Sequence, residues 1–430
     1  PQTTARSRNE RSFSSQVEKC RIHRKSPLLL LPICLYIFKK GYNSFELLRL
    51  NMADLGKIIR SELDGMEPYN AGLSLDEIRS KYDLDVIAKL ASNENPNGPA
   101  PEVLKILSET PTYVYLYPDG SANVLRRKLA TYLDIPEDHL IFGNGSEELI
   151  SIICRSVINT GDRVVTLYPS FPLHEEYAVM MGAEVEQVSV TSDLEVDLEA
   201  LIEAVAKPAK MLIFANPMNP VGCWLRPNEL EAVIKAKHPD TLLVLDEAYY
   251  EYAILGNYCS GDKMLLESGG NWIILRTFSK AWGLAGLRVG FGICSSAELR
   301  GALDLTRTPF NVNASAQLAA SASLDASDFM TANIVKTASE RSRVATALLD
   351  LGYKIAPSLG NFLFFDSRAP SGILADALLR KGTVVKPWKQ ARFGTFLRVS
   401  IGSIEDNDKF IADLRTYSNK AEKGVLSDKV

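Results

Sequence analysis

The sequence has few of the residues that bind metal ions. Its four His are scattered, and its six Cys form no CxxC pair, so the spacing typical of a metal site does not occur. Cysteines without such a pattern indicate reduced thiols in a cytoplasmic protein. We therefore expect no metal site and a cytoplasmic location.

The sequence also lacks an apolar run long enough to cross a membrane. The apolar stretch at residues 27–38 has twelve residues, whereas a spanning helix needs about 20. Lys39 and Lys40 follow it, where a signal peptide would have small residues. We interpret residues 1–51, which begin with Pro1 and precede Met52, as translated upstream sequence, a non-native or disordered extension. A transit peptide and a peripheral anchor are the alternatives.

Positive charge is not in excess. The formal net charge is −4, and residues 1–51 hold ten Lys/Arg and three Glu. The remaining residues therefore have 38 basic and 49 acidic side chains, a net charge of −11. An acidic body argues against binding to anionic polymers, so we expect no nucleic-acid partner and no membrane partner.

Short apolar runs alternate with amphipathic segments from about residue 139. Several runs are apolar at successive positions, which is typical of parallel strands buried on both faces. This alternation predicts an α/β domain with a mainly parallel sheet flanked by helices. The predicted strands lie at residues 139–145, 162–169, 184–190, 210–217, 241–249, 271–280 and 287–294.

The pattern changes after about residue 312. One long helical stretch is expected over 314–352, followed by a strand, a helix and a strand at 361–367, 372–382 and 396–402. We predict a large domain over 93–311 and a smaller α+β domain over 312–430. Residues 52–92 would be an N-terminal arm that contributes to the small domain.

Polar residues follow several predicted strands at the point where each strand ends. In open parallel sheets, ligands bind beyond the carboxyl ends of the strands, so these groups should converge on one crevice. Together they match the needs of pyridoxal phosphate: an amine, a carboxylate for the ring nitrogen, and a helix N-terminus with hydroxyls and an Arg for the phosphate. The groups are 144–147, 168–171, 216–219, 246–249 and 277–280.

Ordered motifs over about residues 58–415 resemble the fold type I, pyridoxal-phosphate-dependent aminotransferases. "TFSKAWGLAGLRVGF" (277–291) is similar to their lysine segment, "DEAYYEY" (246–252) to their aspartate segment, and "ANPMNPVG" (215–222) to their asparagine segment. Other segments resemble the histidinol-phosphate aminotransferase family in particular. These are "IAKLASNENPNGPAPEV" (87–103), "YPDGSANVLRRKLA" (117–130), "GNGSEELI" (143–150), "YPSFPLHEEY" (168–177), "PFNVNASAQLAA" (309–320) and "FLRVSIG" (396–402).

The resemblance implies a role for each residue that would bind the cofactor. Lys280 would hold it as a Schiff base, and Asp246 would pair with the ring nitrogen. Asn219 and Tyr249 would donate to the phenolic oxygen, and Phe171 would stack on the ring. The phosphate would be bound by backbone N–H groups of Ser146 and Glu147 and by the side chains of Thr277, Ser279 and Arg288.

The resemblance also implies a homodimer with shared sites and a set of substrate contacts. Tyr117 would reach the phosphate of the cofactor in the partner subunit. Arg398 would bind the anionic group of the substrate, and Tyr69 would lie near the substrate phosphate. Lys386 stands where the family commonly has an Arg that helps to bind that phosphate.

The reaction implied is amino-group transfer between glutamate/2-oxoglutarate and histidinol phosphate/imidazole acetol phosphate, as in histidine biosynthesis. Lys386 is one departure from the family pattern; Val221 in place of Thr and Trp282 in place of Tyr or Phe are two others. The alternatives are an aminotransferase for aromatic or other amino acids, and a pyridoxal-phosphate-dependent decarboxylase of an amino-acid phosphate. A regulator that binds the cofactor without turnover is a third, although residues 1–51 show no helix-turn-helix pattern.

Overall fold

The computed structural model describes residues 58–70, 72, 74–109 and 114–422. The chain forms two compact units, Pro1–Glu67 and Pro68–Val430. In the first unit the described residues include one short 3-10 helix, η2 (Ser61–Leu63), with no buried residue. The interpretation of residues 1–51 as an extension concerns residues outside the described part of the chain.

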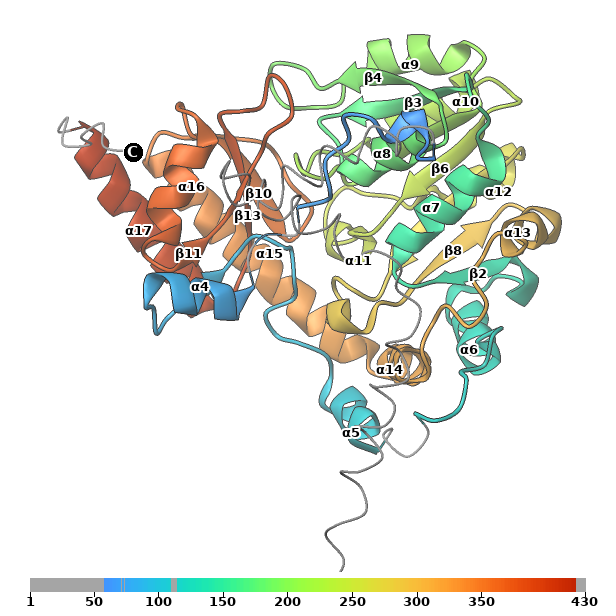
Figure 1. Cartoon of the computed structure of the whole chain (residues 1–430), viewed down its shortest axis with the longest axis horizontal. Coiled ribbons are helices and arrows are strands. Elements are labelled where there is room, and N and C mark those ends of the chain that lie inside the picture. Colours follow the sequence, from blue (N-terminus) through green and yellow to red (C-terminus); the bar gives the residue numbers. More distant parts are fainter. Residues whose placement is uncertain (1–57, 71, 73, 110–113, 423–430) are drawn as a thin grey trace, which may run out of the picture. The chain divides into compact units, whose positions relative to one another are not determined.

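A seven-stranded sheet forms the centre of the second unit (Figure 1). Five neighbouring strands are parallel, and β8 is antiparallel to both of its neighbours, which gives the mixed, mainly parallel sheet predicted from the sequence. Each of the seven predicted strands is present. In sheet order they are β2 (Leu140–Gly143), β8 (Gly290–Cys294), β7 (Trp272–Thr277), β6 (Leu242–Asp246), β5 (Met211–Ala215), β3 (Arg163–Tyr168) and β4 (Glu184–Ser189).

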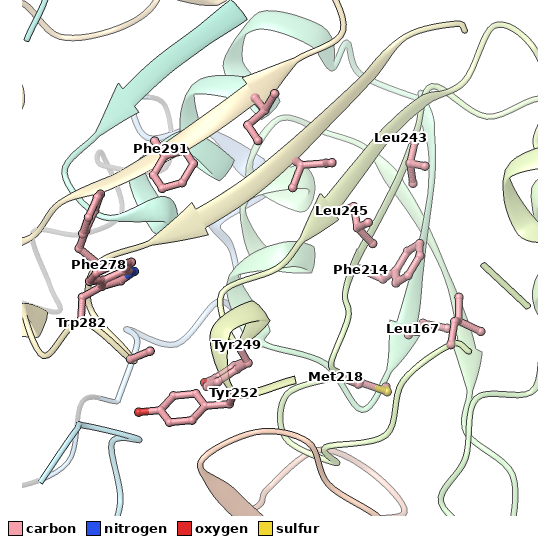
Figure 2. Packing of buried hydrophobic residues seen from close by; sticks show 14 of the residues in the cluster. Leu167, Phe214, Met218, Leu243, Leu245, Tyr249, Tyr252, Phe278, Trp282 and Phe291 are labelled. Atoms are coloured by element: carbon pink, nitrogen blue, oxygen red, sulfur yellow. The ribbon is translucent and has the colours of Figure 1, made fainter. Parts of the chain in front are cut away.

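Both faces of this sheet are buried, which explains the continuous apolar runs. In β6, Leu243 and Leu245 belong to one core cluster, shown in part in Figure 2, whereas Val244 belongs to the cluster on the other face. The first cluster includes side chains from α5 (Pro101–Glu109), α6 (Asn123–Leu133), α9 (Leu198–Ala206), α10 (Pro227–Ala236), α12 (Gly261–Ser268) and α14 (Ala314–Asp325). The second includes side chains from α7 (Ser146–Val157), α8 (Pro172–Met180) and α13 (Ala297–Asp304).

The prediction of one continuous helix over 314–352 is wrong, because the structure has two helices there. The structure divides it into α14 and α15 (Ser327–Asp350), with Ala326 at φ −106° and ψ 31° between them. Asn313 caps α14 by accepting from the backbone N–H of Ala316. The break allows α14 to pack beside α5 and α6 while the later part of α15 packs in another cluster.

A four-stranded antiparallel sheet lies in the C-terminal part of the chain. Its order is β12 (Lys386–Pro387), β13 (Phe396–Ser400), β10 (Phe362–Asp366) and β9 (Lys354–Ile355). Its core includes residues of α15, α16 (Ser371–Leu379) and α17 (Ile404–Glu422). A separate parallel pair joins β1 (Ala88–Lys89) to β11 (Thr383–Val384), so the chain before the large sheet contacts this C-terminal part. The domain boundaries stay predictions.

In its described part, the second unit has two 3-10 helices, η4 (Glu137–His139) and η5 (Ala285–Leu287), and two further short α-helices. The α-helices are α4 (Leu75–Tyr82), which begins with a capping box between Ser74 and Glu77, and α11 (Tyr250–Ala253). No helix among the described residues is long and apolar enough to cross a membrane. The same residues contain no group of three or more His, Cys, Asp or Glu side chains that could hold a metal ion.

Candidate active site

A cavity of about 340 Å³ lies where β5, β6 and β7 end. This volume falls within the usual range for small-molecule sites. The cavity brings together most of the residues expected from the sequence, although they come from separate elements. Its lining residues are Tyr69, Ser146, Glu147, Phe171, Leu173, Tyr177, Ala215, Asn219, Asp246, Ala248, Tyr249, Thr277, Ser279, Lys280 and Arg288.

Lys280 lies in the turn that follows β7. Its Nζ donates a hydrogen bond to the Ser92 carbonyl oxygen at 3.3 Å. Burial lowers the pKa of this amine to about 8, and the positive charge of Arg398 acts in the same direction. An amine with this pKa is unprotonated in roughly one molecule in ten at neutral pH, so Lys280 can act as a nucleophile or as a base.

Asp246 is the last residue of β6 and is buried. One carboxylate oxygen, Oδ1, accepts from the backbone N–H of Ala248 at 3.0 Å, and the other, Oδ2, lies 2.9 Å from His174 Nε2. A buried carboxylate held by two hydrogen bonds at the floor of a cavity fits a cationic ring nitrogen on the ligand.

The cavity also has the components of a phosphate site. Ser146 is the first residue of α7, and the backbone N–H groups of a helix N-terminus attract anions. Arg288 approaches this turn closely, with Nη2 3.4 Å from the Asn144 carbonyl oxygen. A Cβ at Gly145, which has φ +80°, would lie 2.4 Å from Arg288 Nη2. The glycine therefore lets the guanidinium reach the helix end.

Two hydroxyl side chains face the same turn from the end of β7. Thr277 Oγ1 accepts from the backbone N–H of Ser279 at 3.1 Å and donates to Ser279 Oγ at 2.9 Å. Both residues are buried and line the cavity. They add hydroxyl groups to the N-terminus of α7 and Arg288, so the set fits the phosphate of pyridoxal phosphate.

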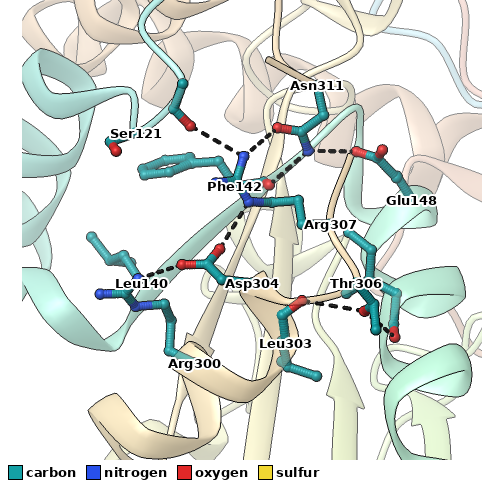
Figure 3. Close-up of polar contacts among 12 residues, drawn as sticks. Ser121, Leu140, Phe142, Glu148, Arg300, Leu303, Asp304, Thr306, Arg307 and Asn311 are labelled. Atoms are coloured by element: carbon teal, nitrogen blue, oxygen red, sulfur yellow. Dashed lines mark hydrogen bonds and ion pairs between the residues drawn. The ribbon is translucent and has the colours of Figure 1, made fainter. Parts of the chain in front are cut away.

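A polar network supports the turn before α7 (Figure 3). Glu148 Oε2 accepts from the Asn144 backbone N–H at 2.6 Å. It also accepts from Asn311 Nδ2 at 2.7 Å, the contact drawn in Figure 3. Asn311 Oδ1 in turn accepts from Arg307 Nη1 at 2.8 Å, and Arg307 Nε donates to Asp304. Side chains outside the cavity thus fix the backbone that would bind the phosphate.

Tyr249 and Asn219 lie together on one wall. Asn219 Nδ2 donates to Tyr249 Oη at 3.3 Å, and Arg398 Nη1 donates to Asn219 Oδ1 at 2.7 Å. Burial raises the pKa of Tyr249 to about 12, so its hydroxyl keeps its proton and can donate it. Phe171 lies in the same cavity, edge-on to His174.

Arg398 is a buried cation on β13 without an acidic partner in the described part of the chain. Its Nη2 donates to the Ala91 carbonyl oxygen at 2.6 Å, and its Nε has no hydrogen-bond partner there. Burial lowers its pKa. Arg398 is not among the lining residues, but it contacts Asn219, which is. A buried charge needs a counterion, so this residue is suited to an anionic substrate group.

Tyr69 and Lys386 lie next to each other. Tyr69 packs edge-on against Phe171, with ring centroids 6.2 Å apart. Lys386 Nζ lies 6.0 Å from the centre of the Tyr69 ring and donates to the Asn70 carbonyl oxygen at 2.6 Å. Burial lowers the pKa of Lys386, and the charge of Arg398 contributes. Lys386 is not a lining residue.

Tyr117 is not brought to this cavity. Its side chain is 83% exposed and stacks on Phe310, with centroids 4.8 Å apart. The neighbouring Val114, Tyr115 and Leu116 are exposed as well.

The two other departures from the family pattern are accommodated within the fold. Val221 is fully buried in the core. Trp282 is buried, and its Nε1 donates to Glu251 Oε1 at 3.0 Å (its place in the core is shown in Figure 2). Neither side chain lines the cavity.

Several residues of the site were not predicted from the sequence. His174 lies three positions after Phe171 in the first turn of α8, a spacing that places both on one helix face. That spacing within "FPLH" was an available signal. Tyr177, whose hydroxyl donates to Glu147 Oε1, lies one further turn along the same helix. Asn93, which contacts Tyr249, lies in the segment 87–103 that resembles the family, but no role was predicted for it.

Comparison with known proteins identifies the family to which the chain belongs. The sequence model of the "Aminotransferase class I and II" family matches residues 85–414. The chain belongs to this family, whose chemistry is the transfer of amino groups between amino and keto acids.

Within the family, the similar curated proteins include histidinol-phosphate aminotransferases. The chain is 50% identical to histidinol-phosphate aminotransferase 3 of Rhizobium meliloti over 364 residues, which cover 85% of this chain and 98% of that protein. It is 48% identical to histidinol-phosphate aminotransferase 1 of Mesorhizobium japonicum over 363 residues, which cover 84% and 99%.

A similar solved structure is histidinol-phosphate aminotransferase from Sinorhizobium meliloti in complex with pyridoxal-5'-phosphate. The TM-score is 0.77 at 27% sequence identity, and the match covers 84% of this chain and 98% of that one. The fold is therefore that of the fold type I aminotransferases, and the family and this neighbour imply pyridoxal phosphate as the cofactor.

Proposed function

We propose that this protein binds pyridoxal phosphate through Lys280 and transfers an amino group between glutamate/2-oxoglutarate and histidinol phosphate/imidazole acetol phosphate. One observation carries the proposal. A reactive amine, a buried carboxylate and a helix N-terminus with an Arg surround the same cavity. The named relatives supply the substrate pair.

The residues divide the tasks of binding. The N-terminus of α7, Thr277, Ser279 and Arg288 bind the phosphate, and Phe171 packs against the ring. Asp246 pairs with the ring nitrogen and keeps it protonated. When bound, pyridoxal phosphate supplies an aldehyde that condenses with amines and a cationic ring that withdraws electrons from the substrate α-carbon.

Lys280 moves the proton in this proposal. Once its Nζ is free, the unprotonated amine removes the proton from the α-carbon of the substrate as a general base. Its pKa of about 8 keeps a usable fraction of the amine unprotonated near neutral pH. Tyr249 and Asn219 donate hydrogen bonds that orient the ring, and Arg398 binds the anionic end of the substrate.

A homodimer with shared sites is part of the proposal. Four consecutive apolar or aromatic residues, 114–117, are more than half exposed, and an exposed apolar segment of this kind is typical of a protein interface. Tyr117 of each subunit would then contact the cofactor phosphate of the other. We further propose a cytoplasmic protein without nucleic-acid or membrane partners.

A second candidate function is favoured by Lys386. Its Nζ donates to the Asn70 carbonyl oxygen and it does not line the cavity, whereas Arg398 keeps an unpaired Nε that could bind a carboxylate. This arrangement would also suit a phosphate-free amino acid, including an aromatic one packed near Tyr69.

A panel of amino donors tests the proposal. The purified protein would be assayed with each donor and 2-oxoglutarate, and the keto product and CO2 would be measured. The proposal expects keto product with histidinol phosphate as the best donor and no CO2. Release of CO2 in place of a keto product would indicate the decarboxylase alternative and contradict the proposal.

A further inference from the structure

Asn93 does not line the cavity, but its side chain contacts Tyr249, which does. It is 1% exposed and has a left-handed backbone conformation, with φ +53°. Its side chain reaches Tyr249, the residue before α11 in the turn that follows β6, while its backbone is bound to Ser400 on β13. Asn361 Nδ2 donates to the Asn93 carbonyl oxygen at 3.0 Å and adds a third support.

The contacts of Ser400 agree with one orientation of the Asn93 amide. Ser400 Oγ accepts from the backbone N–H of Asn93 at 2.8 Å, and that N–H can only donate. The hydroxyl proton of Ser400 is then directed to Asn93 Oδ1, also at 2.8 Å. The amide oxygen is therefore occupied, and Nδ2 faces Tyr249 Oη at 2.9 Å as a donor.

A similar arrangement fixes Asn219. Arg398 can only donate, so its contact with Asn219 Oδ1 turns Asn219 Nδ2 toward Tyr249 Oη. Arg398 and Ser400 are two residues apart on β13, and such residues project from the same face of a strand. One strand thus orients both amides.

The two amides determine what the Tyr249 hydroxyl can do. A phenol oxygen has one proton to donate and accepts through its lone pairs, and both amides approach it as donors. No acceptor for the Tyr249 proton is found among the described residues. Burial holds the pKa of Tyr249 at about 12, with Arg398 lowering it and Asp246 raising it to smaller extents. Tyr249 therefore keeps its hydroxyl proton, and this proton points toward the cavity.

We propose that Asn93 is a positioning residue that directs the Tyr249 O–H into the cavity as a donor to the ligand. The inference rests on the proposed function, in which the phenolic oxygen of pyridoxal phosphate is the acceptor. A donor at that oxygen stabilises its negative charge. The pH at which the bound cofactor changes colour should therefore depend on Asn93.

The test is a spectrophotometric pH titration of the purified full-length protein with bound pyridoxal phosphate. Asn93→Asp has nearly the same shape and tolerates a positive φ, but its carboxylate accepts the Tyr249 proton and turns it away from the cavity. The pH of the colour change should rise by about one unit, equivalent to a tenfold change in the equilibrium. Asn93→Gly, which adds no charge and also tolerates a positive φ, should give a smaller rise.

The same substitutions in a Tyr249→Phe background separate this role from others. If Asn93 acts through Tyr249, neither substitution should shift the titration further in that background. If the substitutions act through a new charge or a less rigid site, the pH of the colour change should shift in both backgrounds. That result would overturn the inference. An unchanged titration in Asn93→Asp would overturn it as well.

Two controls complete the design. Circular dichroism of each variant tests whether it folds. If Asn93→Asp does not fold, Ser400→Ala can be tested in its place. This substitution removes the hydroxyl that contacts the Asn93 amide, so the pH of the colour change should still rise. Failure of the wild type to bind the cofactor would instead contradict the proposed function.

Discussion

His174 Nε2 lies 2.9 Å from Asp246 Oδ2, and both side chains are buried. His174 Nδ1 has no hydrogen-bond partner in the described part of the chain. The hydrogen bond of the His174 imidazole therefore goes to Asp246, the carboxylate that would pair with the ring nitrogen of the cofactor. Because α8 supplies His174 and β6 supplies Asp246, this contact joins a helix to the end of the central sheet.

The first prediction concerns this pair. His174→Ala should lower kcat and cofactor affinity about ten- to a hundredfold, because a hydrogen bond to a charged group contributes roughly 1.5–3 kcal/mol. His174→Gln can place an amide nitrogen near the position of Nε2 and should recover part of the loss. Steady-state kinetics and equilibrium binding of pyridoxal phosphate measure both effects. Equal activity of the Ala variant and the wild type would show that His174 only fills space.

The second prediction follows from the pKa of Lys280, which burial lowers to about 8. Only the neutral amine attacks the cofactor aldehyde. The rate of cofactor attachment to cofactor-free protein should thus rise roughly tenfold per pH unit below about 8 and level off above it. Stopped-flow absorbance measures this rate, and Lys280→Arg, which should not attach the cofactor, is the control. A rate that still rises toward about pH 10 would mean that the amine has an ordinary pKa.

The third prediction concerns substrate preference. Arg grips a phosphate with a planar fork, whereas Lys offers a single point charge. Lys386→Arg should therefore raise the preference for histidinol phosphate over phenylalanine by about ten- to a hundredfold, judged by the ratio of kcat/KM values. If the wild type already prefers histidinol phosphate by many thousandfold and the Arg variant leaves the ratio unchanged, Lys386 contacts the phosphate adequately.

The fourth prediction tests the shared site. Tyr117 is exposed and does not line the cavity of its own subunit. Tyr117→Phe should weaken cofactor binding and activity. Mixing it with inactive Lys280→Ala should form hybrid dimers in which one site has both native residues, so activity should increase on mixing. With subunit exchange verified by mass spectrometry, no increase would argue against a site made by two subunits.

The sequence predicted the central sheet because its strands are buried on both faces and read as continuous apolar runs. Lys280 and Asp246 were predictable because each follows such a run directly and belongs to an ordered motif. The break at Ala326 was missed because neither Gly nor Pro marks it, although Asp325, Ser327 and Asp328 beside it favour helix ends.

The supporting contacts of the site were also beyond prediction. His174 and Asp246 are 72 residues apart, and Asn93 and Tyr249 are 156 apart. Nothing local in the sequence links such pairs. They are brought together by the order of strands in the sheet and by the return of the N-terminal segment to β13.

Amino-group transfer by this protein is tested most directly in the half-reaction of the cofactor-loaded protein with histidinol phosphate, in the absence of any keto acid. Imidazole acetol phosphate should form in an amount equal to the number of active sites, while the yellow absorbance disappears. Adding 2-oxoglutarate should then restore the absorbance and yield glutamate, and Lys280→Ala should show neither step. Formation of CO2, or a loss of absorbance without a keto product, would show that the protein does not transfer the amino group of histidinol phosphate.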